Sequence, residues 1–129
     1  MSRPSQDEVS GLLGLAQRAG AVAAGVPAVR QAVRVGDARL VVLAGDASPA
    51  QLRKVQALLE HRDIPVRWFD RRRDLGAPVG LPELSAIAIT TQSFAEQLLV
   101  KLSTRVRTDP DDVDAHRDPK EESSTNAGR

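Results

Sequence analysis

The 129-residue chain contains no cysteine and no tyrosine, and its only histidines are His61 and His116. Without cysteine it can form no disulfide, perform no thiol chemistry and build no Cys/His zinc site. It also lacks an apolar run near the ~18 residues that a membrane-spanning helix needs, and its N-terminus lacks a signal-peptide core. These absences predict a cytoplasmic protein that uses no metal and no other cofactor.

Motifs for catalysis are missing as well. Gly20 and Gly25 have the spacing of a phosphate-binding loop, but Val26-Pro27 stand where that loop requires Lys-Ser/Thr. Asp46 follows an expected strand, as catalytic acids of α/β enzymes do, yet a turn role is favoured because no second acid or histidine supports it. His61 lies in a hydrophilic run, which favours a solvated surface residue. We therefore expect no enzymatic activity.

The charges divide the chain into two parts. Residues 1–106 carry 14 Lys and Arg against 10 Asp and Glu, whereas residues 107–129 carry 4 against 7. The second segment also has few apolar residues that could be buried, which is typical of disorder. We predict one folded, mildly basic domain over residues 1–106 and a disordered acidic tail over residues 107–129.

The stretch 24–49 indicates the architecture. Pro27 suits the first position of a helix, and Gly36 supplies the left-handed exit that ends one. The following run at 40–44 is apolar at every position, which is typical of a strand that is covered on both faces. A sheet enclosed between helices is the architecture that buries such a strand.

Helical periodicity, capping residues and short apolar runs predict the remaining elements. Capping boxes are expected at Ser5 with Glu8 and at Ser48 with Gln51, and Asp70 is expected to cap a short helix that Pro78 and Gly80 terminate. The alternation of helices and strands predicts an α/β protein of the three-layer α/β/α sandwich type. The expected helices cover 5–19, 27–35, 49–59, 71–77 and a segment from Thr91 or Ser93 to 102; the expected strands cover 21–24, 40–44, 64–69 and 85–90.

Two features suggest a surface for an anionic partner. Arg71–Arg73 fall in the first turn of a helix, where the helix dipole disfavours each cation by ~0.3–1 kcal/mol. An anionic ligand would explain that placement; a solvated face partly neutralised by Asp70 and Asp74 explains it equally well. The helix that begins near Pro27 also offers backbone N–H groups that can bind a phosphate. Trp68 is expected to pack in the sheet rather than to stack on a base.

Several sequence blocks together resemble the kink-turn RNA-binding ribosomal protein family, the L-seven-Ae/L-thirty-e group, and more narrowly its small bacterial members. The resemblance covers residues 8–102 in order. It implies an α/β/α sandwich around a four-stranded mixed sheet and RNA binding without catalysis, in a ribosomal or ribosome-associated protein. The blocks are LLGLAQRAG at 12–20, the turn at Gly25, ARLVVLAGDASP at 38–49, IPV at 64–66, DLGAPVG at 74–80 and AIAITTQSFAEQL at 86–98.

The resemblance also implies a binding site. Family members read sheared G·A pairs with Asn-Glu-x-x-Lys at the start of the second helix, and these readers fall on Pro27, Ala28 and Gln31 here. A bidentate base contact is worth ~1–3 kcal/mol of discrimination, so their loss predicts a relaxed or different RNA specificity. The family's apolar loop persists at 81–84 and its basic helix start at Arg72. The implied RNA-binding residues are Gly25, Val26, Pro27, Ala28, Arg30, Gln31, Arg72, Leu81, Glu83 and Leu84.

Two other functions fit the same scaffold. The uncharged segment 21–28 could dock an apolar partner, which would make the protein an interaction module. Similar folds also serve as substrate-binding domains of RNA methyltransferases, so the chain could recruit RNA to a modifying enzyme that it does not itself contain. The expected partners are structured RNA, the ribosome or such an enzyme, and the expected oligomeric state is a monomer.

Overall fold

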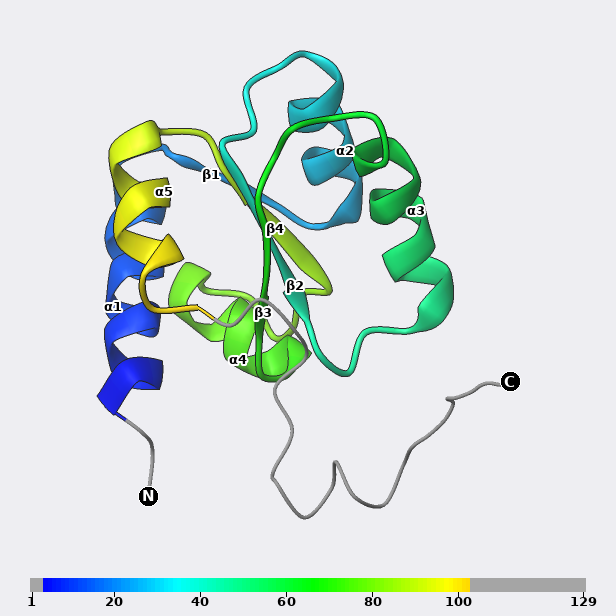
Figure 1. Ribbon diagram of the computed structural model, residues 1–129. Coiled ribbons are helices and arrows are strands. Elements are labelled where there is room, and N and C mark those ends of the chain that lie inside the picture. The colour runs from blue at the N-terminus through cyan, green and yellow to red at the C-terminus, as the bar shows by residue number, and fades with distance from the viewer. Residues whose placement is uncertain (1–3, 103–129) are drawn as a thin grey trace.

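The computed structural model describes the backbone of residues 4–102 and the side chains of residues 6–102. The acidic tail predicted at 107–129, and the domain boundary at 106, lie outside that range. Helices and strands alternate along the described chain (Figure 1). The elements are α1 (Pro4–Arg18), β1 (Val22–Ala24), α2 (Val26–Arg34), β2 (Leu40–Ala44), α3 (Pro49–Leu59), β3 (Val66–Phe69), α4 (Arg72–Gly76), the 3₁₀ helix η1 (Ala77–Val79), β4 (Ala86–Ile89) and α5 (Gln92–Leu99).

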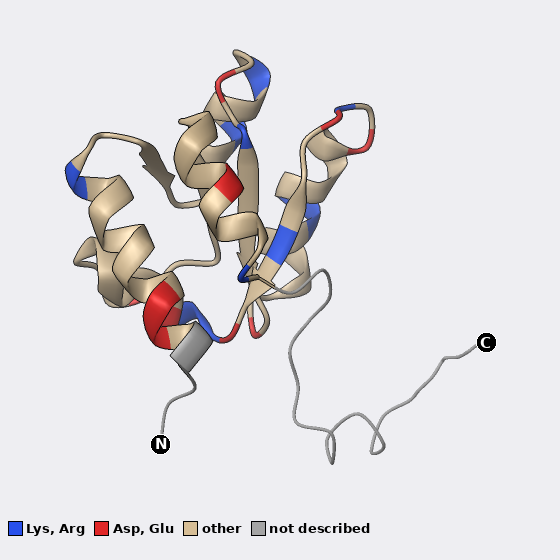
Figure 2. Cartoon of the chain, turned by 60° about the vertical axis from the view of Figure 1, so that its left-hand side comes forward, with Lys and Arg blue, Asp and Glu red and all other residues tan. Residues whose placement is uncertain are grey.

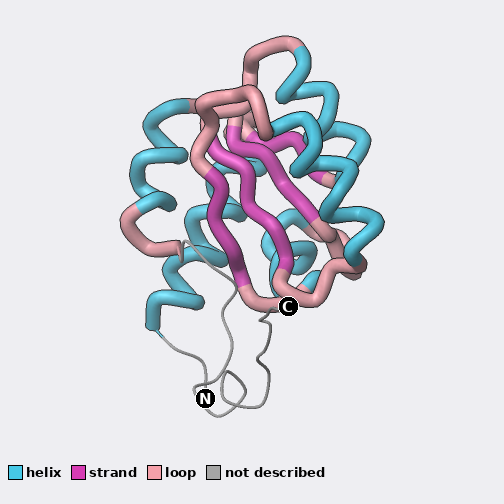
Figure 3. The backbone as a smooth tube through the Cα atoms, turned by 45° about the vertical axis from the view of Figure 1, so that its right-hand side comes forward, coloured by secondary structure: helices cyan, strands magenta, loops and turns pink. Residues whose placement is uncertain are grey.

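The four strands form one mixed sheet, shown in magenta between the helices in Figure 3, and their order across it is β1-β4-β2-β3. β2 and β3 run parallel, whereas β4 is antiparallel to both of its neighbours. Helices α1, α4 and α5 cover one face of the sheet, and α2 and α3 cover the other (Figure 1). The predicted α/β/α sandwich and the four-stranded mixed sheet are both confirmed.

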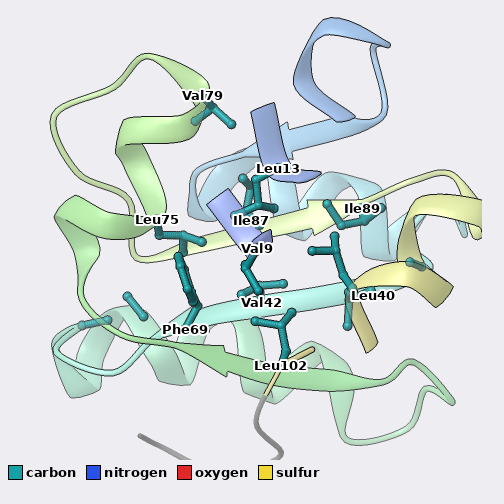
Figure 4. Packing of buried hydrophobic residues seen from close by; sticks show 14 residues of the cluster. Val9, Leu13, Leu40, Val42, Phe69, Leu75, Val79, Ile87, Ile89 and Leu102 are labelled. Atoms are coloured by element: carbon teal, nitrogen blue, oxygen red, sulfur yellow. The ribbon is translucent and has the colours of Figure 1, made fainter. Parts of the chain in front are cut away.

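β2 is the strand on which both hydrophobic cores depend. All five of its residues are buried, and their side chains alternate between the two faces as the pleat of a strand requires. Leu40, Val42 and Ala44 join the core beneath α1, α4 and α5, part of which Figure 4 shows with Leu75 of α4 beside Phe69 of β3. Val41 and Leu43 join the core beneath α2 and α3. The unbroken apolar run therefore serves two cores at once.

The expected helix signals are mostly confirmed, with small shifts. Ser48 caps α3 by accepting a 3.3 Å hydrogen bond from the Gln51 backbone N–H. Gly36 ends α2 with a φ of 82°. Pro27, expected at the first helical position, is at the second, because α2 begins at Val26. α1 begins at Pro4, before Ser5, which was expected to cap it.

The short helix after β3 starts later than expected. Its N-cap is Arg71 rather than Asp70, since the Asp74 carboxylate accepts a 3.3 Å hydrogen bond from the Arg71 backbone N–H. Pro78 was expected to help end this helix, and it lies in η1, the 3₁₀ turn that follows α4. Gly80 ends that turn with a φ of 81°. Among the helices of residues 4–102, none is long and apolar enough to cross a membrane.

Candidate nucleic-acid interface

The start of α2 and the loop at residues 81–84 meet at Gly25. Gly25 has φ 94° and ψ 154°, a conformation that only glycine adopts readily. A Cβ placed there would lie 3.8 Å from Leu84 Cδ2, and the Gly25 backbone N–H donates a 3.0 Å hydrogen bond to the Ala86 carbonyl. Two segments almost sixty residues apart in the sequence are thus held side by side.

The loop 81–84 is fastened to α4 at both ends. The Leu81 N–H donates to the Gly76 carbonyl at 3.0 Å, and the Leu84 N–H donates to the Arg72 carbonyl at 2.9 Å. Between these bonds the loop backbone passes so close to Gly76 that a Cβ there would be 2.8 Å from Glu83 Cα. Gly76 is therefore required by the close approach of two backbones, which explains a glycine inside a short helix.

The surface around this junction is largely uncharged. Pro27 and Gln31 lie one helical turn apart and are exposed, Ala28 is half-buried, and Val26 is buried. Leu81 adds an apolar side chain that is 42% exposed. Pro27 also removes one backbone N–H from the first turn of α2, so fewer donors remain for a phosphate than in a helix without proline.

Arg72 supplies the cation at the edge of this surface. Its Nε lies 3.6 Å from Asp46 Oδ1, and its Nη1 lies 3.7 Å from Glu83 Oε2. Both separations are longer than a hydrogen bond, and Nε is buried without a hydrogen-bond partner. The guanidinium is therefore held between two carboxylates by charge alone.

Asp46 is a member of this site that sequence reasoning assigned only to a turn. Its Oδ1 accepts a 2.7 Å hydrogen bond from the Arg72 backbone N–H, so it holds the first turn of α4. The Gly45 N–H also donates to the Asp70 carbonyl at 2.7 Å, which ties the two loops together. Because β2 and β3 are parallel, their carboxyl ends share one edge of the sheet, and that arrangement could have predicted the contact.

The predicted site residues thus fall into two groups. The structure brings Gly25, Val26, Pro27, Ala28, Arg72, Leu81, Glu83 and Leu84 to one end of the sheet, and Gln31 lies one helical turn beyond Pro27 on α2. Arg30 is directed elsewhere, because its Nη1 donates to the Lys54 backbone carbonyl in α3. That these residues bind RNA stays a prediction.

Charge does not gather into a single broad field over the described chain. Figure 2 shows Lys and Arg interspersed with Asp and Glu, mostly at loops and exposed helix turns. Arg71 and Arg73 are exposed beside the half-buried Asp70 and Asp74.

Within residues 4–102 no group of three or more His, Cys, Asp or Glu could hold a metal ion. Trp68 packs against the core of α2 and α3, as expected.

Comparison with known proteins supports the resemblance that the sequence suggested. The model of the Ribosomal protein L7Ae/L30e/S12e/Gadd45 family matches residues 7–99. The RNA-binding protein YlxQ of Bacillus subtilis is 35% identical over 88 residues, which are 68% of this chain and 88% of that protein. The large ribosomal subunit protein eL8 of Thermoplasma volcanium is 26% identical over 90 residues, 69% of this chain and 74% of that protein.

A solved structure extends the likeness to three dimensions. A protein of unknown function from Bacillus halodurans superimposes with a TM-score of 0.68 and 31% sequence identity. The match covers 72% of this chain and 94% of that one. Because the family match spans most of the described residues and the sheet order agrees with the expected sandwich, the chain belongs to the Ribosomal protein L7Ae/L30e/S12e/Gadd45 family.

Proposed function

We propose that this chain is a cytoplasmic, ribosome-associated RNA-binding protein that acts without catalysis. The observation that carries the proposal is the junction at Gly25, which joins the start of α2, the loop 81–84 and Arg72 into one surface. A backbone phosphate can approach the N–H groups of Val26 and Ala28, and the exposed Leu81 can cover an unstacked base. YlxQ, a relative named as an RNA-binding protein, and the eL8 ribosomal proteins support the same role.

The specificity we propose is relaxed. Pro27, Ala28 and Gln31 stand where the family readers would be, and neither Pro nor Ala carries a side-chain group that can bond a base edge. Affinity would then depend on shape, on the phosphate backbone and on apolar contact with a displaced base. Such contacts favour folded RNA over an extended single strand, because only folded RNA presents them together.

A salt-dependent binding titration tests this proposal. The full-length protein is titrated against a kink-turn RNA, a perfect duplex and an unstructured single strand at several salt concentrations. We expect preference for the kink-turn RNA, with a shallow slope of log K against log salt because few phosphates are contacted. Equal affinity for all three RNAs, or no retention at low salt, would contradict the proposal.

A protein-interaction module is the second candidate function. It is favoured by the uncharged exposed surface at Pro27 and Leu81, which suits an apolar protein partner as well as a base. Crosslinking in cells followed by both RNA sequencing and mass spectrometry separates the two. Recovery of protein partners that persists at high salt, without crosslinked RNA, would favour the module. Crosslinks mapping to ribosomal RNA would favour RNA binding.

A further inference from the structure

The two carboxylates beside Arg72 are held in different ways. Asp46 has a second role, since it also accepts the 2.7 Å hydrogen bond from the Arg72 backbone N–H. Glu83 faces the guanidinium only at 3.7 Å, and its side chain is 59% exposed on the loop 81–84. Removing Asp46 from Arg72 would disturb the first turn of α4, whereas Glu83 can turn into solvent without breaking a backbone contact.

The guanidinium itself has unused capacity. Its side chain is 40% exposed, and neither carboxylate approaches within 3.5 Å of the nitrogen that it faces. An Arg fork can bind a phosphate through two parallel hydrogen bonds, which is stronger than a charge contact beyond hydrogen-bond distance. A phosphate that reaches this edge of the surface would thus be preferred over Glu83.

We propose that Glu83 limits the RNA affinity of this site by occupying on Arg72 the anion position that an RNA phosphate takes in the complex. The inference rests on the proposed function, since it needs RNA to be the ligand. Exposed ion pairs change equilibrium constants by a factor of only about two to five, so displacement of Glu83 is feasible. A ligand that brings a phosphate to Arg72 must displace Glu83 and so loses a few-fold in affinity, whereas a ligand that leaves Arg72 untouched does not.

A double-mutant cycle between positions 83 and 72 tests the proposal. Affinity for a kink-turn RNA is measured for the full-length wild type, Glu83→Gln, Arg72→Gln and the double variant. We expect Glu83→Gln to tighten binding by about three- to fivefold when Arg72 is present. In the Arg72→Gln background the same change should alter affinity by less than about 1.5-fold, because Glu83 and the RNA phosphate then have no guanidinium to compete for.

The matched control is Glu60→Gln, which removes the same charge from an exposed residue at the end of α3, on the opposite side of the sheet. It should leave affinity unchanged. An equal gain from Glu83→Gln in both backgrounds would show general repulsion of RNA and overturn the proposal, as would no gain in either. If no variant and no wild type binds structured RNA, the proposed function itself fails and the inference falls with it.

Discussion

The two ends of the sheet both carry arginines, but they use them differently. At the end where α2 terminates, Arg62 Nη1 donates to the Val33 carbonyl at 2.6 Å and Arg39 Nη1 donates to the Gly36 carbonyl at 3.0 Å. Arg62 adds a second donor to the Val33 carbonyl, which also accepts a 3.2 Å hydrogen bond from the Gly36 N–H, and Arg39 bonds the Gly36 carbonyl just beyond the helix. At the other end Arg72 faces only carboxylates beyond hydrogen-bond distance.

The difference separates cations that stabilise the fold from a cation that can serve a ligand. A guanidinium bonded to backbone carbonyls cannot leave them without losing hydrogen bonds that hold the end of α2, which costs folding stability. A guanidinium paired loosely with an exposed carboxylate can exchange one anion for another at little cost. The number of arginines at a surface is therefore a poor guide to its anion affinity. The acceptors that already bind each guanidinium determine whether it is available to an anionic ligand.

The strongest way to break the comparison is to disturb the close approach that holds the loop 81–84 on α4. Gly76→Ala places a Cβ 2.8 Å from backbone atoms of Leu81 and Glu83, which cannot move as a flexible side chain would. We expect the free energy of unfolding to fall by about 2–3 kcal/mol, measured by denaturant titration. Gly11→Ala, in open space on α1, is the control and should be neutral or slightly stabilising. Equal stability of both variants would contradict this account of the loop.

Restoring the family readers tests the ligand-binding end directly. A triple variant with Pro27→Asn, Ala28→Glu and Gln31→Lys adds one negative and one positive charge, so its net charge is unchanged. We expect affinity for a kink-turn RNA to rise by a factor corresponding to ~1–3 kcal/mol, measured by filter binding. Absence of any gain would mean that the start of α2 does not meet the sheared G·A pairs. A duplex without those pairs serves as the control ligand.

The paired variants Arg62→Gln and Arg72→Gln sharpen the contrast between the two ends. Arg62→Gln should lower the free energy of unfolding by about 1 kcal/mol through loss of the bond to Val33, with RNA affinity unchanged. Arg72→Gln should weaken RNA binding several-fold and leave thermal stability nearly unchanged, because its side-chain contacts are exposed ion pairs. Thermal melts and binding titrations on both proteins check this. The reverse pattern would assign the two arginines to the opposite roles.

The smallest effect on stability is expected from a deletion that touches neither end of the sheet. Deleting residues 107–129 should leave the unfolding midpoint essentially unchanged, since the predicted tail has few apolar residues to contribute. Calorimetry of the truncated and full-length proteins measures it. A large fall in the midpoint would show that the tail packs on the domain.

Much of the fold could be predicted because local signals agree with it. The run at 40–44 specified a strand buried on both faces, and Gly36 and Ser48 marked helix ends that the structure confirms. Errors arose where tertiary contacts replace local caps. Asp70 was the expected cap of α4, but Asp46, from a distant loop, accepts the Arg72 N–H instead.

The site was harder to predict than the fold. Sequence reasoning placed Arg72 and the loop 81–84 together only through the family resemblance, and it could not show that Glu83 faces the same guanidinium. Arg30 was assigned to the site from its position in the helix, yet its side chain reaches α3. Such pairings depend on how helices and loops pack across the sheet, and no local pattern reports that. Gly76 was the one available hint, because an isolated glycine in a helical pattern indicates a close backbone approach.

The division of the β2 side chains between two cores affects how the molecule can open. If either helical layer detached alone, one row of those side chains would be exposed to water while the other stayed covered. We therefore expect no stable state in which only one layer is unfolded. Loss of structure is then shared by the whole sandwich.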